Sequence, residues 1–163
     1  MEFVNADLIA AELWPGQEST HAYEASGLAN QRRADLIDER RSFATETVFS
    51  HESKIELLRE AVQGGYLVTL HIIIVPEHLA VSRVENRVEH GGHTVPEEKI
   101  RARYQRLWKH VAVGIGIAEN AFVYNNSSIK HAYRLIAHYH YGQKIQTDKW
   151  PSWAPLELTG ASD

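Results

Sequence analysis

Arginines that could bind phosphate are concentrated in one stretch of the sequence, residues 81–106. Arg83 and Arg87 are one helical turn apart and therefore share a face of a first predicted helix. A glycine pair ends this helix, His93 lies in the elbow, and Pro96 starts a second helix. The second helix adds three arginines, Arg101, Arg103 and Arg106. Guanidinium groups make planar, bidentate contacts with phosphate oxygens, so the stretch predicts a helical-hairpin lid over phosphate.

Acidic residues in the same stretch allow a second interpretation. An ordinary solvated hairpin would pair its arginines with these acids, and such surface ion pairs carry no chemistry. The acids are Glu85, Glu89, Glu97 and Glu98. The residue pattern leaves both interpretations open.

Two carboxylates lie where a reaction could use them. Asp7 follows a short apolar stub, Phe3-Val4, and precedes a helical pattern. That order places it at the carboxyl end of a strand, where ligands bind in open α/β folds; its alternative role is a helix N-cap. Glu46 lies in a predicted strand over 42–50, where a buried carboxylate needs a partner or a function. The alternative for Glu46 is an exposed acid on an edge strand.

Strands alternate with helices along the chain, and this order predicts the fold. The expected elements are helices over 20–40 and 53–63, a long second lid helix to about Asn120, and strands over 42–50, 66–75 and 121–124. The solvated face of the first helix is assigned to Arg32, Arg33, Glu39 and Arg40. The β-branched run at 66–75 is expected to be a central strand, covered on both faces. The remainder is expected to be strand-rich, with a turn at Gly142. We predict an α/β fold with three layers and a mostly parallel sheet, in which 1–163 form one domain, 81–106 its lid and 151–163 a tail.

Composition excludes several classes of protein. The formal net charge of −4 argues against a general nucleic-acid-binding protein, so no nucleic-acid partner is expected. Cysteine is absent, which excludes disulfides and cysteine–zinc sites and fits a cytoplasmic protein. No apolar run is long enough to span a membrane, and the first residues lack the pattern of a secretory signal. His138 and His140 could begin a metal site, but spacing fixes no third ligand, so no metal site is predicted.

Five segments carry a resemblance to a known family. They are FVNADLIA at 3–10, ERRSFATET at 39–47, GGYLVTLHIIIV at 64–75, RVENRVEHGGHTVPEEKIRARYQR at 83–106 and VYNNSS at 123–128. In this order they resemble the zeta-toxin-like family of P-loop kinases. The resemblance implies a P-loop kinase-like fold with ATP and Mg²⁺ as cofactors. It also implies γ-phosphate transfer to a hydroxyl of a nucleotide sugar such as UDP-N-acetylglucosamine, and an antitoxin protein as partner.

The resemblance also implies three kinds of site residue. The catalytic groups are expected at Asp7, Arg87 and Arg103, with Asp7 as general base and the arginines on the transferring phosphoryl group. The substrate contacts are expected at Glu46, Thr47 and His93. The nucleotide contacts are expected at Arg83, Arg101 and Asn126. Asn125 departs from the family, which usually has aspartate there, so a charge-dependent role at that position is in doubt.

The family's phosphate-binding motif, GxxxxGK[ST], does not occur in the sequence. The nearest candidates, GQESTHAY at 16–23 and GQKIQTDK at 142–149, lack the second glycine and the Gly-Lys pair. We therefore expect an N-terminally truncated family member that neither binds ATP-Mg²⁺ tightly nor transfers phosphate. The missing strand would open two sheet edges, so a homo-oligomer, a swapped element or a rearranged sheet is expected. The alternative is a non-catalytic interaction module that binds a partner protein or itself.

Overall fold

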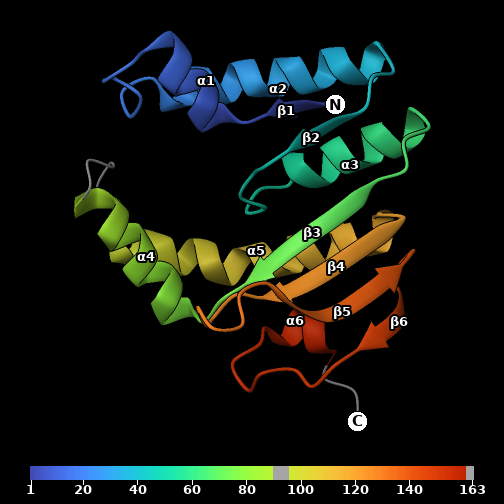
Figure 1. Cartoon of the computed structure of the whole chain (residues 1–163). Coiled ribbons are helices and arrows are strands. Elements are labelled where there is room, and N and C mark those ends of the chain that lie inside the picture. Colours follow the sequence, from blue (N-terminus) through green and yellow to red (C-terminus); the bar gives the residue numbers. More distant parts are fainter. Residues whose placement is uncertain (90–95, 161–163) are drawn as a thin grey trace. The chain divides into compact units, whose positions relative to one another are not determined.

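The computed structural model describes residues 1–89 and 96–160, apart from the side chains of 85 and 87–89. It has two compact units, Met1–Val48 and Phe49–Asp163 (Figure 1). Among the described residues, no helix combines the length and the apolar character that crossing a bilayer requires.

The first unit is a β-α-α-β arrangement. Its elements are β1 (Glu2–Val4), α1 (Ala6–Leu13), α2 (Ala22–Asp38) and β2 (Phe43–Thr45). The two strands are parallel, with Val4 opposite Thr45. Val4 packs with Ala29 and Leu36 of α2 in a small core. The helix predicted over 20–40 is therefore confirmed.

The strand predicted over 42–50 is shorter than expected. It ends at Thr45, and residues 46–48 are exposed. The physical reason is that β1 offers only three residues for pairing. The alternation of side chains in residues 42–50 therefore continues beyond the last backbone hydrogen bonds between the strands. Glu46 consequently follows the strand and is exposed, which corrects the expectation of a buried acid.

The second unit is built on a four-stranded sheet with the order β3-β4-β5-β6. Its strands are β3 (Thr69–Ile74), β4 (Asn120–Asn125), β5 (Arg134–His140) and β6 (Gln143–Thr147). Its helices are α3 (Ser53–Gln63), α4 (Glu77–Glu89), α5 (Glu97–Ile117) and α6 (Leu156–Thr159). The α/β fold is thus confirmed, and the two helices of the lid hairpin occur where the sequence predicted them (Figure 1).

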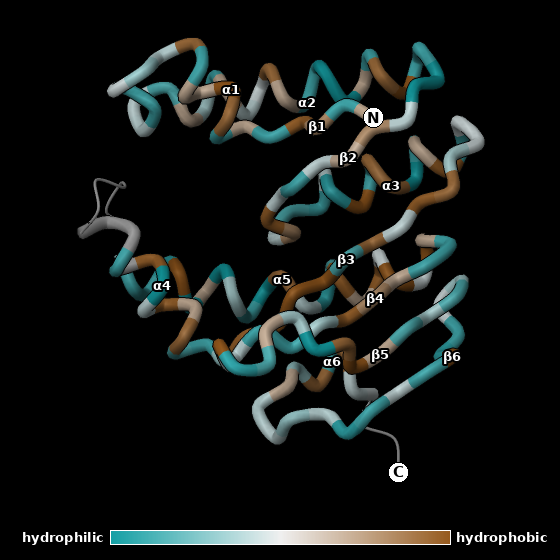
Figure 2. The backbone as a smooth tube through the Cα atoms, viewed as in Figure 1, coloured by the Kyte–Doolittle hydropathy of each residue, from teal (hydrophilic) through white to brown (hydrophobic). Residues whose placement is uncertain are grey.

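Strand directions in this sheet are mixed. β3 and β4 are parallel, as expected, whereas β4–β5 and β5–β6 are antiparallel. β3 lies at the end of this sheet, not at its centre, and its alternate residues Thr69, His71 and Ile73 are exposed. The β-branched run predicted the strand correctly but not its position, because hydropathy along one strand does not specify its neighbours. β6 is exposed along its whole length and largely hydrophilic (Figure 2).

The core of this unit lies between the sheet and α5. Its buried residues include Ile74, Trp108, Val111, Ile115, Val123 and Ile136. Gly114 is where α5 approaches its neighbours most closely: a Cβ there would lie 3.2 Å from side-chain carbons of both Leu58 and Phe49. The glycine therefore serves helix packing.

Candidate functional site

The carboxyl ends of β1 and β2 bring two predicted site residues to one edge of the first unit. Asn5 follows β1 and caps α1: its Oδ1 accepts hydrogen bonds from the backbone N–H of Asp7 (2.7 Å) and Leu8 (3.2 Å). The cap of α1 is therefore Asn5, so the alternative N-cap role for Asp7 is wrong. Asn5 Nδ2 also donates to Glu46 Oε2 over 3.3 Å. Asp7, Glu46 and the exposed Thr47 consequently lie at the same end of this two-stranded sheet.

A buried arginine supports that edge, and the sequence analysis assigned it wrongly to a solvated surface. Arg33 of α2 is only 3% exposed. Its guanidinium donates to Thr45 Oγ1 (3.0 Å) and to the Asn30 side chain. Burial without a carboxylate partner among the described residues lowers the pKa of Arg33 from its ordinary value. The missed signal was periodicity, because Arg33 shares a helix face with Ala29 and Leu36, which are fully buried.

The corresponding edge of the second unit holds two of the predicted nucleotide-binding residues. Arg83 of α4 donates through Nη2 to the backbone carbonyl of Asn126 over 2.9 Å. The Asn126 N–H in turn donates to the carbonyl of Ile74, the last residue of β3, over 3.0 Å. Asn125 Oδ1 accepts from the Ser127 N–H over 2.9 Å, a turn contact that an amide makes as well as a carboxylate. The first helix of the lid is thus fixed beside the carboxyl ends of β3 and β4.

Arg101 ties the second lid helix to the first. Its guanidinium donates to Glu97 Oε1 (2.6 and 2.8 Å) and to Glu77 Oε1 (3.1 Å). These hydrogen bonds, that to Glu97 first, raise the pKa of Arg101 from its ordinary value. For this residue the contacts match the alternative interpretation, in which acids of the hairpin pair with its arginines.

The remaining lid residues fall into two groups. Arg103 is exposed on α5, and no carboxylate pairs with it in the part of the chain that the structure describes. Arg87 belongs to α4, one turn after Arg83, but its side chain lies outside the described residues. His93 and the glycine elbow also lie outside them. The roles expected for Asp7, Glu46 and the lid arginines stay a prediction.

Neither glycine segment that most resembles a phosphate loop has a geometry that fits one. Gly16 follows the end of α1, and its N–H donates to Glu18 Oε1 over 2.8 Å. Hydrogen bonds from the backbone N–H groups of Gly16 and Glu18 lower the pKa of the Glu18 carboxyl. Gly142 forms the turn between the antiparallel strands β5 and β6, not a strand-to-helix loop. Neither segment therefore has the geometry of a phosphate-binding loop.

The histidine pair on β5 has an amide partner. His138 Nε2 and His140 Nδ1 lie 3.0 and 3.4 Å from Asn120 Oδ1, and the His138 ring stacks on Phe122 with centroids 4.3 Å apart. Within residues 1–89 and 96–160, no group of three or more histidine or acidic side chains could hold a metal ion. These histidines form part of a polar and aromatic layer on one face of the sheet.

Comparison with known proteins identifies the family. No curated protein matches the chain. The sequence model of the family described as Zeta toxin matches residues 15–134, which is more than half of the chain. The match includes β2, β3, β4 and both arginine-bearing helices, whereas Asp7 precedes it and α6 follows it. The chain therefore belongs to the zeta toxin family.

Proposed function

We propose that this chain carries the acceptor side of an ATP-dependent phosphotransferase, whose substrate is a hydroxyl of a nucleotide sugar such as UDP-N-acetylglucosamine. The family is kinase-like and ATP-dependent and belongs to a toxin–antitoxin context. The observation that carries the proposal is the joint placement of Asp7 and Glu46 at the carboxyl edge of β1 and β2, linked through Asn5.

In this proposal Asp7 accepts the proton of the attacked hydroxyl. Its exposed carboxylate lies in the first turn of α1, with the capping amide of Asn5 beneath it. General-base catalysis of this kind contributes about 10²- to 10⁴-fold to rate. Glu46 and Thr47, which directly follow β2, would orient the substrate.

The lid arginines of the second unit would have different roles. Arg103 has no carboxylate partner among the described residues and would contact the transferring phosphoryl group. Arg83 and Arg101 hold the helices in place through Asn126, Glu77 and Glu97. An antitoxin-like protein that covers the exposed arginine is the partner we propose.

We also propose that these 163 residues alone do not transfer phosphate. The support is the context of Gly16 and Gly142, neither of which leaves a set of backbone N–H groups for a triphosphate. Positioning the phosphates is most of what a kinase does, so the base and the arginines cannot compensate for the lack of a cradle.

The test compares the chain with a version extended by a strand-GxxxxGK[ST]-helix segment of about 30 residues, the size of such a βα unit. Calorimetric titration with ATP-Mg²⁺ and transfer to a panel of nucleotide sugars are measured on both. We expect binding and transfer by the extended chain only. In that chain Asp7→Asn should lose transfer at least about a hundredfold and keep ATP affinity, while Glu12→Gln on the same helix should change neither. Tight ATP binding by the unextended chain, or full transfer by Asp7→Asn, contradicts the proposal.

A further inference from the structure

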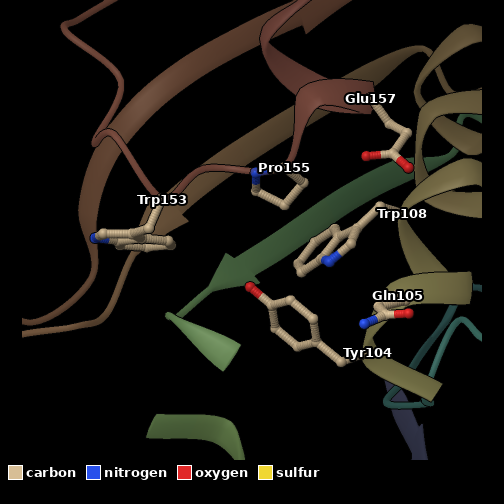
Figure 3. Close-up of a pocket in the computed structure, with 6 residues that line it drawn as sticks. All are labelled: Tyr104, Gln105, Trp108, Trp153, Pro155 and Glu157. Carbon is tan, nitrogen blue, oxygen red and sulfur yellow. The ribbon is translucent and has the colours of Figure 1, made fainter. Parts of the chain in front are cut away.

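A small cavity lies between α5 and the segment that follows β6, and none of its lining residues is one of those assigned to phosphate. Its volume is about 150 Å³, and its walls are Tyr104, Gln105, Trp108, Trp153, Pro155 and Glu157 (Figure 3). Three of these six come from the segment beyond residue 134, where the match to the zeta toxin family ends. One wall of the cavity thus comes from a part of this chain that the family match does not include.

Three of the six lining residues carry aromatic rings, and two of these rings are held in place by packing and hydrogen bonding. Trp108 is 5% exposed, and the Tyr104 ring meets it edge-on with centroids 5.2 Å apart. The Tyr104 hydroxyl donates to the carbonyl of Val75 over 2.8 Å, which fixes the ring against the end of β3. Burial raises the pKa of Tyr104 to about 12, so its phenol stays neutral at physiological pH. Trp153 adds a third ring from the opposite wall (Figure 3).

The one charged side chain among the six lining residues is negative. Glu157 is the one ionisable acid of the cavity, and none of the six lining residues carries a positive charge. Figure 3 shows the Glu157 carboxylate on the side of the cavity occupied by Trp108. The backbone around it is anchored, because Leu158 is buried and its carbonyl accepts from Tyr139 Oη over 3.1 Å. A carboxylate beside aromatic faces attracts a cation and repels an anion.

The indole N–H of Trp108 has no acceptor among the residues that the structure describes. Its nitrogen is closed off from solvent, so this N–H is not available to a ligand in the cavity. The ligand that complements the wall is therefore a soft cation.

We propose that this cavity binds a quaternary or N-methylated ammonium group. Aromatic cages recognise such cations because the ring faces carry negative potential and the methyl groups lower the cost of desolvation. The volume corresponds to about five water molecules, enough for a trimethylammonium head group and too small for a nucleotide. The group can belong to a free molecule such as choline or to a trimethylated lysine side chain of a protein.

The experiment uses the intact chain and four probes: tetramethylammonium, choline, a peptide with one trimethyl-lysine, and 3,3-dimethylbutan-1-ol, the neutral carbon isostere of choline. Binding is followed by ligand-observed NMR and by tryptophan fluorescence. We expect choline to bind about threefold to thirtyfold more tightly than the isostere, the range of a cation–π contribution. Comparison of choline with the peptide distinguishes the free from the protein-borne source.

Variants locate the site without disturbing the core. Glu157 is exposed, so Glu157→Gln should fold normally and weaken choline binding severalfold while leaving the isostere unchanged. Trp153→Phe should weaken the binding of all three cationic probes, because phenylalanine is a poorer cation–π partner than tryptophan. Glu60→Gln, an exposed acid on α3, is the matched control and should change nothing. The proposal is overturned if no cationic probe binds, if the isostere binds as tightly as choline, or if Glu157→Gln and Glu60→Gln behave alike. None of these outcomes depends on phosphoryl transfer.

Discussion

Arg33 Nη1 donates to Thr45 Oγ1 over 3.0 Å, and that hydroxyl in turn donates to the carbonyl of Val4 over 2.7 Å. One threonine thereby links the buried guanidinium of α2 to both strands of the first unit. The link explains how a charged side chain is kept inside a core as small as that around Val4 and Leu36.

Thr45→Val removes the hydroxyl and keeps the shape of the side chain. The Arg33 guanidinium and the Val4 carbonyl then each lose a partner, so we expect the free energy of unfolding to fall by about 1–3 kcal/mol. Urea unfolding measures the change. Thr47→Val, the same substitution at an exposed position, should stay within about 0.5 kcal/mol. Equal effects of the two substitutions would contradict the role of the hydroxyl.

The Glu2–Arg32 pair makes the stability of the first unit depend on pH in the acidic range. Arg32 donates to both Glu2 carboxylate oxygens over 2.6 and 2.7 Å, and these bonds lower the pKa of Glu2. A lowered pKa in the folded state means that the pair stabilises the fold above about pH 4.3, the ordinary glutamate value. That contribution is lost as the pH falls through the lowered pKa. Glu2→Gln should therefore be less stable than the parent near pH 7, and the difference should disappear in strong acid. Thermal unfolding from pH 7 to pH 2 tests this, and a difference that does not change with pH would refute it.

Substitution by alanine should change the stability in opposite directions at two glycines. Gly142 has φ +72°, and a Cβ there would lie 3.2 Å from the Gly116 Cα, so Gly142→Ala should cost about 1 kcal/mol or more. Gly27 lies within α2, and beyond its chain neighbours and the backbone of its own helix no atom of the described residues lies within 4 Å of the added Cβ. Gly27→Ala should stabilise by about 0.5–1 kcal/mol through helix propensity. Denaturant midpoints of the two variants, compared with the parent, should lie on opposite sides of it.

Alanine substitutions of Arg101 and Arg103 should differ in how their effect on stability depends on salt. Arg101→Ala removes the bridge between Glu77 and Glu97, so the urea midpoint should fall at low salt. The loss should shrink in 1 M NaCl, where charges are screened within about 3 Å. Arg103→Ala should leave the midpoint unchanged at both salt concentrations. A destabilising Arg103→Ala would show that this arginine has a structural partner.

Local periodicity predicted the helices, the lid pair and most strands because each of these depends on residues close in sequence. Two features depend on distant partners and were not predictable in this way. The length of β2 is limited by the three residues of β1, and the position of β3 at the sheet end depends on which strands pair with it. Of the site residues, Asp7 was expected after the first strand and follows it, whereas Glu46 was expected within a strand that in fact ends at Thr45. The burial of Arg33 was not predicted, because its charge favours an exposed position although it shares a helix face with the buried Ala29 and Leu36.

The pairing of β3 with β4 also has a kinetic consequence. β5 and β6 are joined by a turn at Gly142, so their hairpin closes a short loop. β3 and β4 are parallel, and the chain from Ile74 to Asn120 contains both arginine-bearing helices. Closing the longer loop costs more entropy, so we expect the hairpin to form first and the parallel pair later. Pulse-labelling hydrogen exchange should protect β5 and β6 before β3. Brief separation of β3 from β4 in the folded protein would then loosen the attachment of α4, because Arg83 is held at the loop after β4.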